Sequence, residues 1–287
     1  SNEALSRYLE NVAFNLEATP KSGFEFVGWS HTPEGAIIDS NTKIEVIATE
    51  NINYFAVFKE NSICLVPSII EGTEVLVRAC SPYYMNTDVF VKEGSVLIIE
   101  PGVEIKISEG TNLIVNGAII AKGDSEREIV FGGLKDQEPW GAINLLNTPD
   151  TSIFNFVTIR HASKGIIPTR DKGALSLFKA NVKLNHLNIT EVYDNPIFAQ
   201  YSWISMDNSI LQSKVTGDLI NVKYGSAFIS NTTFVGNREP DTDGIDYDEI
   251  YDGKIINCEF YDFLGFNSDG IDTVSYTHLT LPTNREV

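Results

Sequence analysis

The chain has 287 residues, of which 39 are acidic and 21 are basic, so its net charge is −18. This charge repels the phosphates of nucleic acids and of anionic membranes, and neither is an expected partner. A hydrophobic content of 43% is sufficient for packed cores. No apolar run reaches the roughly 20 residues that would cross a bilayer, so no membrane insertion is expected within this chain.

The three cysteines contain no CxxC pair, which argues against a zinc site or a redox motif. Cys64 and Cys80 could form a disulfide, but two buried thiols are the expectation.

Residues 1–60 predict a small β-rich module. A short helix is expected at 3–11, followed by strands at 12–18, 24–29, 43–48 and 53–58, where apolar and polar residues alternate between turns rich in proline and glycine. The pattern Ala-x-Pro-x-x-Gly-Phe-x-Phe-x-Gly-Trp-Ser over 18–30 resembles the internalin-type B-repeat of bacterial surface proteins. The resemblance implies a spacer or adhesive unit without catalysis, with Phe24, Phe26 and Trp29 packed in its core.

Residues 61–273 contain a repeated pattern, a short apolar strand that holds a small polar residue and ends in a large apolar one. The final apolar positions are 159, 189, 210, 234 and 260, at spacings of 30, 21, 24 and 26. Each interval is long enough for one coil of a parallel β-helix, with inward apolar side chains stacked along the axis. The asparagines expected to bridge neighbouring coils are Asn155, Asn185, Asn208, Asn231 and Asn257.

The start of this region adds a resemblance to a fold family. The segment 88–105 contains Leu-Ile-Ile-Glu-Pro-Gly-Val-Glu-Ile, and 113–123 contains Leu-Ile-Val-Asn-Gly-Ala-Ile-Ile-Ala-Lys-Gly. These motifs are similar to the opening coils of bacterial right-handed parallel β-helix proteins with a pectate-lyase-like fold. The sequence therefore predicts an all-β chain, in which a right-handed parallel β-helix at 61–273 follows the β-rich module. The resemblance specifies the fold and leaves the activity open.

The last fourteen residues, 274–287, resemble a translated sequencing-library adapter. They are therefore excluded from fold and site arguments, and the β-helix is expected to be C-terminally truncated after Thr273.

An acidic element occurs twice near the end of the predicted β-helix. Asp-Gly-Ile-Asp occupies 243–246 and again 269–272, 26 residues apart, so the two copies are expected to stack on successive coils. Stacked carboxylates require a cation, raised pKa values or solvation. The first reading is a Ca²⁺ site, because paired carboxylates and turn carbonyls are calcium ligands. Its candidate ligands are Asp241, Asp243, Asp246, Asp248, Asp269 and Asp272.

Two further readings remain open at these coils. Asn267-Ser-Asp-Gly-Ile-Asp272 resembles the Asn-Thr-Asp-Gly motif of polygalacturonase-type hydrolases, which implies Asp269 and Asp272 as an acid–base pair. In that family an Asp-Asp pair, a Gly-His-Gly and an Arg-x-Lys follow, which here would come after Thr273, in the part expected to be truncated. Because the element already occurs at Asp243, it is expected to be a repeat feature, and enzyme activity is not the first expectation. The aromatic residues that could stack on sugar rings are Tyr201, Trp203, Tyr224 and Tyr247, although partial core burial is the alternative for each.

The sequence as a whole indicates an extracellular or cell-surface structural or adhesive module, with a polysaccharide or cell-surface glycan as the candidate ligand. One alternative is a polysaccharide-active hydrolase or lyase whose catalytic coils are missing. A second is a scaffold joined to a spore-coat-kinase-like domain.

Overall fold

The computed structural model describes residues 12–21, 24–47, 52–60, 63–273 and 279–280. Contacts divide the chain into two units, Ser1–Cys64 and Leu65–Val287, each of which is described by itself. Within the described residues every element is a strand, except for one 3₁₀ turn, η1 (Arg78–Cys80). The all-β prediction is confirmed, and the helix expected at 3–11 lies outside the described residues. No helix in this part of the chain is long and apolar enough to span a membrane.

The first unit consists of two antiparallel strand pairs. β1 (Ala13–Glu17) pairs with β3 (Lys43–Ile47), and β2 (Phe24–Ser30) pairs with β4 (Phe55–Glu60). These are the four predicted strands, and β1 and β3 bury alternate side chains as half-buried strands do.

The core of this unit forms around Trp29, which is 5% exposed and packs with Ala18, Ile44 and Val46. The ring of Phe26 meets that of Trp29 edge-on at 5.6 Å between centroids, so core packing of these two residues is confirmed. The prediction was wrong for Phe24, the first residue of β2, which is 45% exposed and is not among the residues packed against this cluster.

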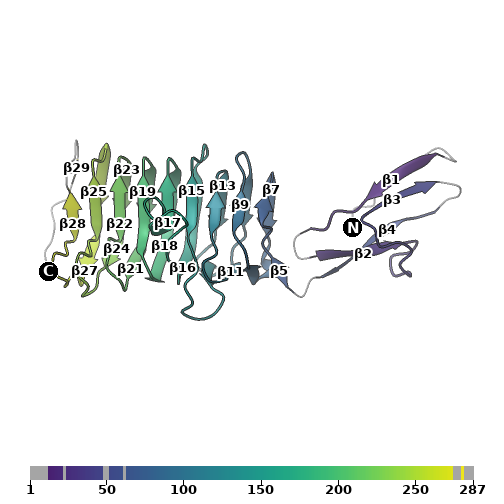
Figure 1. The fold of residues 1–287 in the computed structure, drawn as a ribbon, viewed down its shortest axis with the longest axis horizontal. Coiled ribbons are helices and arrows are strands. Elements are labelled where there is room, and N and C mark those ends of the chain that lie inside the picture. The colour runs from purple at the N-terminus through teal and green to yellow at the C-terminus, as the bar shows by residue number, and fades with distance from the viewer. Residues whose placement is uncertain (1–11, 22–23, 48–51, 61–62, 274–278, 281–287) are drawn as a thin grey trace. The chain divides into compact units, whose positions relative to one another are not determined.

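The second unit is a parallel β-solenoid, and all its described strand pairings are parallel. Its nine-stranded sheet has one strand from each coil: β6 (Ile69–Ile70), β9 (Val89–Val91), β12 (Leu113–Val115), β15 (Ile143–Leu146), β17 (Gly173–Phe178), β19 (Asn195–Gln200), β22 (Ile220–Lys223), β25 (Ile245–Asp248) and β28 (Ile271–Thr273). Figure 1 shows the strands of successive coils side by side along the solenoid axis.

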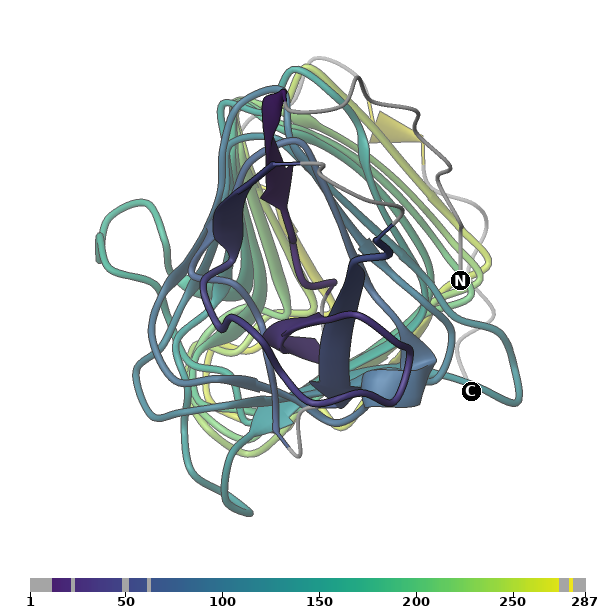
Figure 2. The same cartoon turned by 90° about the vertical axis from the view of Figure 1, so that its right-hand side faces the viewer.

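The other two faces of the solenoid are joined into one 16-stranded sheet, because β16 and β18 bend across the corner between them. One face contains β7 (Thr73–Leu76), β10 (Val96–Ile99), β13 (Ala118–Lys122), β16 (Ser152–Arg160), β18 (Asn181–Val192), β20 (Trp203–Asp207), β23 (Ser226–Ser230), β26 (Asp252–Ile256) and β29 (Leu279–Thr280). The other contains β5 (Cys64–Leu65), β8 (Tyr83–Met85), β11 (Glu104–Ile107), β14 (Ile129–Gly133), the second halves of β16 and β18, β21 (Ile210–Ser213), β24 (Thr233–Val235) and β27 (Glu259–Tyr261). Viewed along the axis, the coils superpose into a three-sided outline (Figure 2).

The corner between these two faces requires a left-handed backbone conformation. β16 bends at Phe156 and β18 at His186, both with φ of 49°, and their rings stack with centroids 4.1 Å apart. The next three coils place Asn208, Asn231 and Asn257 at the same corner, with φ between 47° and 51°. Asparagine suits this position because it tolerates the left-handed region better than most residues.

Hydrogen bonds between asparagine side chains connect neighbouring coils along this corner, as the sequence predicted. They run from Asn185 to Asn155 at 2.8 Å, from Asn208 to Asn185 at 3.2 Å and from Asn257 to Asn231 at 2.7 Å. Asp207 joins the two halves of the ladder, since its carboxylate accepts hydrogen bonds from Asn208 and Asn231, both at 2.7 Å.

The register of the repeat differs from the prediction at one coil. Ile189 pairs with Leu211 and not with Ile210, which is 46% exposed. Ile210 pairs with Asn188, so the predicted inward position was one residue too early, and an offset of one residue moves a side chain to the other face of a strand. The inward column therefore runs through Leu211.

The cysteines also differ from the expectation. Cys64 and Cys80 are both disulfide-bonded, whereas Cys258 is a free cysteine. The expectation of two buried thiols was wrong, because the distance between two cysteines depends on the turns between them and not on their spacing in sequence.

Of the C-terminal segment 274–287, the described residues are Leu279 and Thr280. They form β29, which pairs with β26. The remainder of this segment lies outside the described residues, and its resemblance to an adapter stays a prediction.

The asparagine hydrogen bonds along this corner predict which of two substitutions at Asn231 destabilises the protein more. Asn231→Ala is expected to lower the free energy of unfolding by about 1–2 kcal/mol, because it removes two ladder hydrogen bonds and places alanine at a φ of 47°. Asn231→Gly removes the same bonds without the backbone strain and is expected to cost less. Urea denaturation of both variants measures the difference, and equal losses would contradict a role for the left-handed corner.

Candidate functional site

The outer face of the nine-stranded sheet changes chemistry along the solenoid. In-register pairing aligns one outward column, which reads Phe90, Ile114, Asn144, Ser176, Phe198, Asn221, Asp246 and Asp272. The column begins apolar, continues with neutral polar residues that Phe198 interrupts, and ends acidic. Because parallel strands lie about 4.8 Å apart, each of these side chains has the next as its neighbour.

A pocket opens over the middle of this face and is called the outer pocket below. It has a volume of about 310 Å³, at the lower end of the roughly 300–1,000 Å³ of ligand sites. It is lined by Lys164, Pro168, Lys172, Asp194, Asn195, Phe198, Gly217, Asp218, Asn221 and Lys223. These residues come from the loop before β17, the turns before β19 and β22, and the outer faces of those two strands.

Asn221 lies at the centre of the polar contacts in the outer pocket. Its side chain is only 5% exposed, and its Nδ2 donates hydrogen bonds to Asp218, at 2.8 Å, and to Asp246 on the next coil. The Oδ1 of the same amide is buried and has no hydrogen-bond partner within the described structure. A buried acceptor without a donor is costly, so this oxygen is a ready contact for a ligand donor.

The neighbouring carboxylates are electrostatically coupled. Burial, together with the charges of Asp218 and Asp248, raises the pKa of Asp246 to about 7. Burial also raises the pKa values of Asp194 and Asp218. The site can therefore hold a proton near neutral pH, which an exposed aspartate does not.

The lysines of the outer pocket differ in their contacts. Lys223 is paired with Asp248, and Lys164 lies 3.9 Å from Asp194. The Nζ of Lys172 lies 5.6 Å from the centroid of the Phe198 ring, and within the described residues no carboxylate lies at ion-pair distance from it. Lys172 therefore has donors to offer, and its ammonium group lies over the ring of an outward phenylalanine that is 1% exposed.

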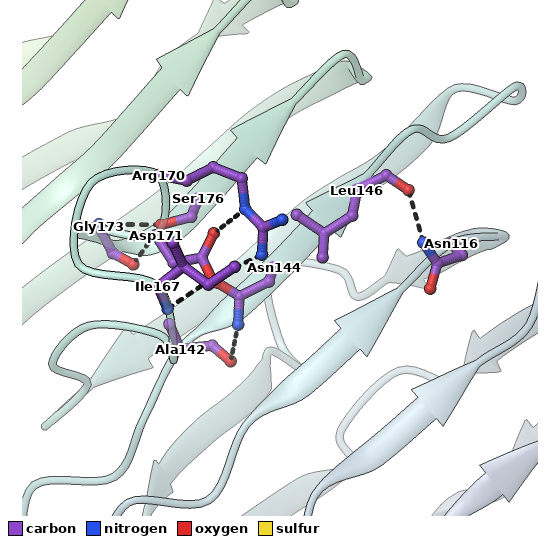
Figure 3. Close-up of polar contacts among 9 residues, drawn as sticks. All are labelled: Asn116, Ala142, Asn144, Leu146, Ile167, Arg170, Asp171, Gly173 and Ser176. Atoms are coloured by element: carbon purple, nitrogen blue, oxygen red, sulfur yellow. Dashed lines mark hydrogen bonds and ion pairs between the residues drawn. The ribbon is translucent and has the colours of Figure 1, made fainter.

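One wall of the outer pocket is the loop 163–172, which an internal ion pair fixes in place. Arg170 donates to Asp171 from Nε at 2.5 Å and from Nη2 at 2.9 Å, and the backbone N–H of Ile167 donates to the same carboxylate at 3.1 Å (Figure 3). The hydrogen bonds to Asp171 raise the pKa of Arg170. Gly165 packs tightly here, since a Cβ on it would lie 2.4 Å from the Oδ1 of Asn144.

The predicted acidic residues divide between two places. The stacking of the two Asp-Gly-Ile-Asp elements is confirmed by the pairing of Asp246 with Asp272. Asp246, Asp248 and Asp272 lie on the outer sheet face, whereas Asp241, Asp243 and Asp269 lie in the preceding turns.

The turn residues form contacts of their own. Asp243 accepts the backbone N–H of Asp269 at 2.6 Å, and Asp241 accepts a hydrogen bond from Asn267 at 2.7 Å. Burial is the main cause that raises the pKa of Asp243. Among the residues that the structure describes, no group of three or more metal-ligating side chains is placed to hold a metal ion. Calcium binding stays a prediction of the sequence.

The four aromatic candidates lie in three different environments. Tyr201 and Tyr224 stack on each other at the corner after β19 and β22, with ring centroids 5.1 Å apart, and Tyr201 is 48% exposed. Trp203 lies on the adjacent face, where its ring packs near that of Phe228 at 6.3 Å. Tyr247 points into the solenoid and is 0% exposed, so no face of its ring is open to a sugar.

Sequence reasoning missed most of the outer pocket, including Asp194, Asn195, Asp218 and Asn221. A signal was present, because an aspartate or asparagine stands three residues before the outward strand position in four successive coils. These pairs are Asn195 and Phe198, Asp218 and Asn221, Asp243 and Asp246, and Asp269 and Asp272. The final two pairs were predicted as a site because both of their members are acidic. The first two pairs, which were not predicted, line the outer pocket.

Comparison with family models matches residues 3–62 to the divergent InlB B-repeat domain. The predicted B-repeat is therefore confirmed for that segment. Comparisons with curated proteins and with solved structures find no match for the chain.

The raised pKa of Asp246 predicts that stability falls as the pH rises. The folded state holds a proton that the unfolded state releases near pH 4, so its stability relative to the unfolded state decreases between about pH 4 and pH 7. Asp246→Asn is expected to be more stable than the parent above pH 7, by about 1–2 kcal/mol after screening of this half-exposed group. Thermal melts from pH 4 to pH 8 measure this, with exposed Asp150→Asn as the charge-matched control. A pH-independent difference would contradict the assignment.

The ion pair within loop 163–172 predicts energetic coupling. Asp171→Ala is expected to lower the free energy of unfolding by about 2 kcal/mol, because its buried carboxylate accepts three charged or backbone donors. A double-mutant cycle with Arg170→Ala is expected to give a coupling of about 1–2 kcal/mol. The exposed pair of Arg127 and Asp124 is the matched control and is expected to show weaker coupling, because solvent screens exposed ion pairs. Additive losses at Arg170 and Asp171 would show that the pair does not fix the loop.

Proposed function

We propose that this chain belongs to a cell-surface or secreted protein, in which the B-repeat is a spacer and the solenoid binds glycan in the outer pocket. The outer pocket is the observation that carries the proposal. Sugar sites commonly combine carboxylate and amide groups, which fix hydroxyls, with an ordered concave surface. Asp218, Asn221 and Asn195 supply such groups, and the loop 163–172 supplies a fixed wall.

The location outside the cell is supported by two independent features. Disulfides persist in oxidising compartments and are rare in the cytosol, and Cys64 and Cys80 are disulfide-bonded. The matched B-repeat at residues 3–62 belongs to a domain type that is typical of cell surfaces.

The stacked tyrosines extend this proposed binding surface. Tyr201 and Tyr224 follow Phe198 and Asn221 by three residues and lie at the corner just after β19 and β22. The chain between each tyrosine and the pocket residue before it therefore spans at most about 10 Å. An oligosaccharide that lies along the strands can therefore occupy the outer pocket and reach the tyrosine pair. Aromatic faces stack favourably on the apolar faces of sugars.

A second candidate function is glycan cleavage, which the pair of Asp218 and Asp246 favours. Both carboxylates accept hydrogen bonds from one amide nitrogen, and the pKa of Asp246 is raised to about 7. Glycoside hydrolysis uses one protonated and one ionised carboxyl group. Asp272, a candidate from the sequence, is the neighbour of Asp246 on the next coil.

Binding of the full chain to a glycan array tests the proposal. The parent is expected to bind a subset of glycans, and Asp218→Asn is expected to weaken that binding roughly 10-fold by removing a charged acceptor. Asp150→Asn carries the same charge change outside the outer pocket and is expected to bind as the parent does. Absence of binding to every glycan would overturn the proposal. New reducing or unsaturated ends on a bound glycan, lost in Asp246→Asn, would establish cleavage in place of simple binding.

A further inference from the structure

Hydrogen-bonding groups in the outer pocket are arranged for a ligand that both donates and accepts. The buried Oδ1 of Asn221 has no donor within the described structure, and the amide side chain of Asn195, a residue that is 7% exposed, lines the same pocket. Lys172 offers ammonium donors beside them. Sugar hydroxyl groups match this mixture, because each can donate one hydrogen bond and accept others.

The charges around the outer pocket oppose a charged sugar of either sign. Asp194 and Asp218 line the same space as Lys164, Lys172 and Lys223. Lys223 is paired with Asp248 from the next coil, so groups of both charges lie close together around the pocket. A carboxylate or sulfate on the ligand would lie against the two aspartates, in a protein whose net charge is −18. The ammonium group of an amino sugar would lie against the three lysines. Each case places like charges together in a partly desolvated site.

We infer that the outer pocket binds an uncharged sugar ring, with hydroxyl groups that donate to Asn221 and accept from Lys172. This inference rests on the proposed glycan binding and adds the class of ligand. In this inference the charged groups around the outer pocket select uncharged over charged sugars. The exposed tyrosine pair beyond the outer pocket does not discriminate between different sugar rings.

Matched neutral and acidic probes test the inference. Oligosaccharides of glucose, galactose and mannose are compared before and after oxidation of their C6 hydroxyl to a carboxylate, with binding to the full chain measured by calorimetry. At least one neutral oligosaccharide is expected to bind, and its oxidised form is expected to bind at least 10-fold more weakly. The affinity for the neutral form is expected to stay constant between 50 and 500 mM NaCl, because no net charge is neutralised.

Two variants connect the result to the outer pocket. Lys172→Gln keeps a neutral donor and is expected to weaken neutral-sugar binding only about 2- to 5-fold, whereas Asn195→Ala removes both of its polar groups and is expected to weaken it about 5- to 10-fold. Lys122→Gln, at an exposed position of β13 and outside the outer pocket, is the control and is expected to have no effect.

The outcomes separate this inference from the proposal on which it rests. Binding confined to the oxidised probes, lost in Lys172→Gln, would overturn the uncharged-ligand inference and leave glycan binding standing. Neutral binding that is unchanged in both variants would place the ligand elsewhere and overturn the inference. Absence of binding by every probe and by the wider array would overturn both.

Discussion

In-register hydrogen bonding between successive coils is the constraint on which the rest of the solenoid depends. Each strand of the nine-stranded sheet pairs with the equivalent strand of the next coil, so residue types repeat in columns and not only along the chain. Inward columns of isoleucine, leucine and valine fill the core, as in Leu175, Ile197 and Ile220. The same register aligns outward side chains, whether or not their chemistry is compatible. The surface of the protein is thus built from stacked neighbours, each about 4.8 Å from the next.

Stacking on the same residue type in the next coil stabilises some residues and destabilises others. Neutral amides satisfy each other from coil to coil, which is why Asn185, Asn231 and Asn257 can form a ladder. Aromatic rings also stack, as Tyr201 and Tyr224 do at the corner that follows β19 and β22. Both corners have left-handed backbone conformations, so asparagine satisfies the geometry and the hydrogen bonding together. Aspartates in a column meet with the same charge, and that conflict requires a local solution.

The sequence was sufficient for the fold because the solenoid repeats its signals. Strand patterns, apolar columns and the asparagine ladder recur in several coils, so an error at one position, such as Ile210, leaves the architecture unchanged. The candidate site was predicted less well. Asp246 and Asp272 attracted notice as a visible repeat, but the outer pocket combines Lys172, Asp194 and Asn221 from three coils. Their proximity depends on how the loop 163–172 folds back over the sheet. The ion pair of Arg170 and Asp171 fixes this loop, but it occurs in one coil and forms no repeated pattern in the sequence.

The outer pocket follows from the way the acidic column is accommodated. At its C-terminal end, Asp246 meets Asp272, and the conflict is reduced by the proton that Asp246 retains, by its hydrogen bond from Asn221 and by the nearby charge of Lys223. Because Asn221 directs its amide nitrogen toward Asp218 and Asp246, its carbonyl oxygen is left without a donor at the centre of the face. The coils before it carry neutral or aromatic outward residues, and Lys172 covers Phe198. The hydrogen bonds that stabilise the stacked aspartates thus leave the Oδ1 of Asn221 without a donor, close to the ammonium group of Lys172. A ligand rich in hydroxyl groups can donate to the first and accept from the second.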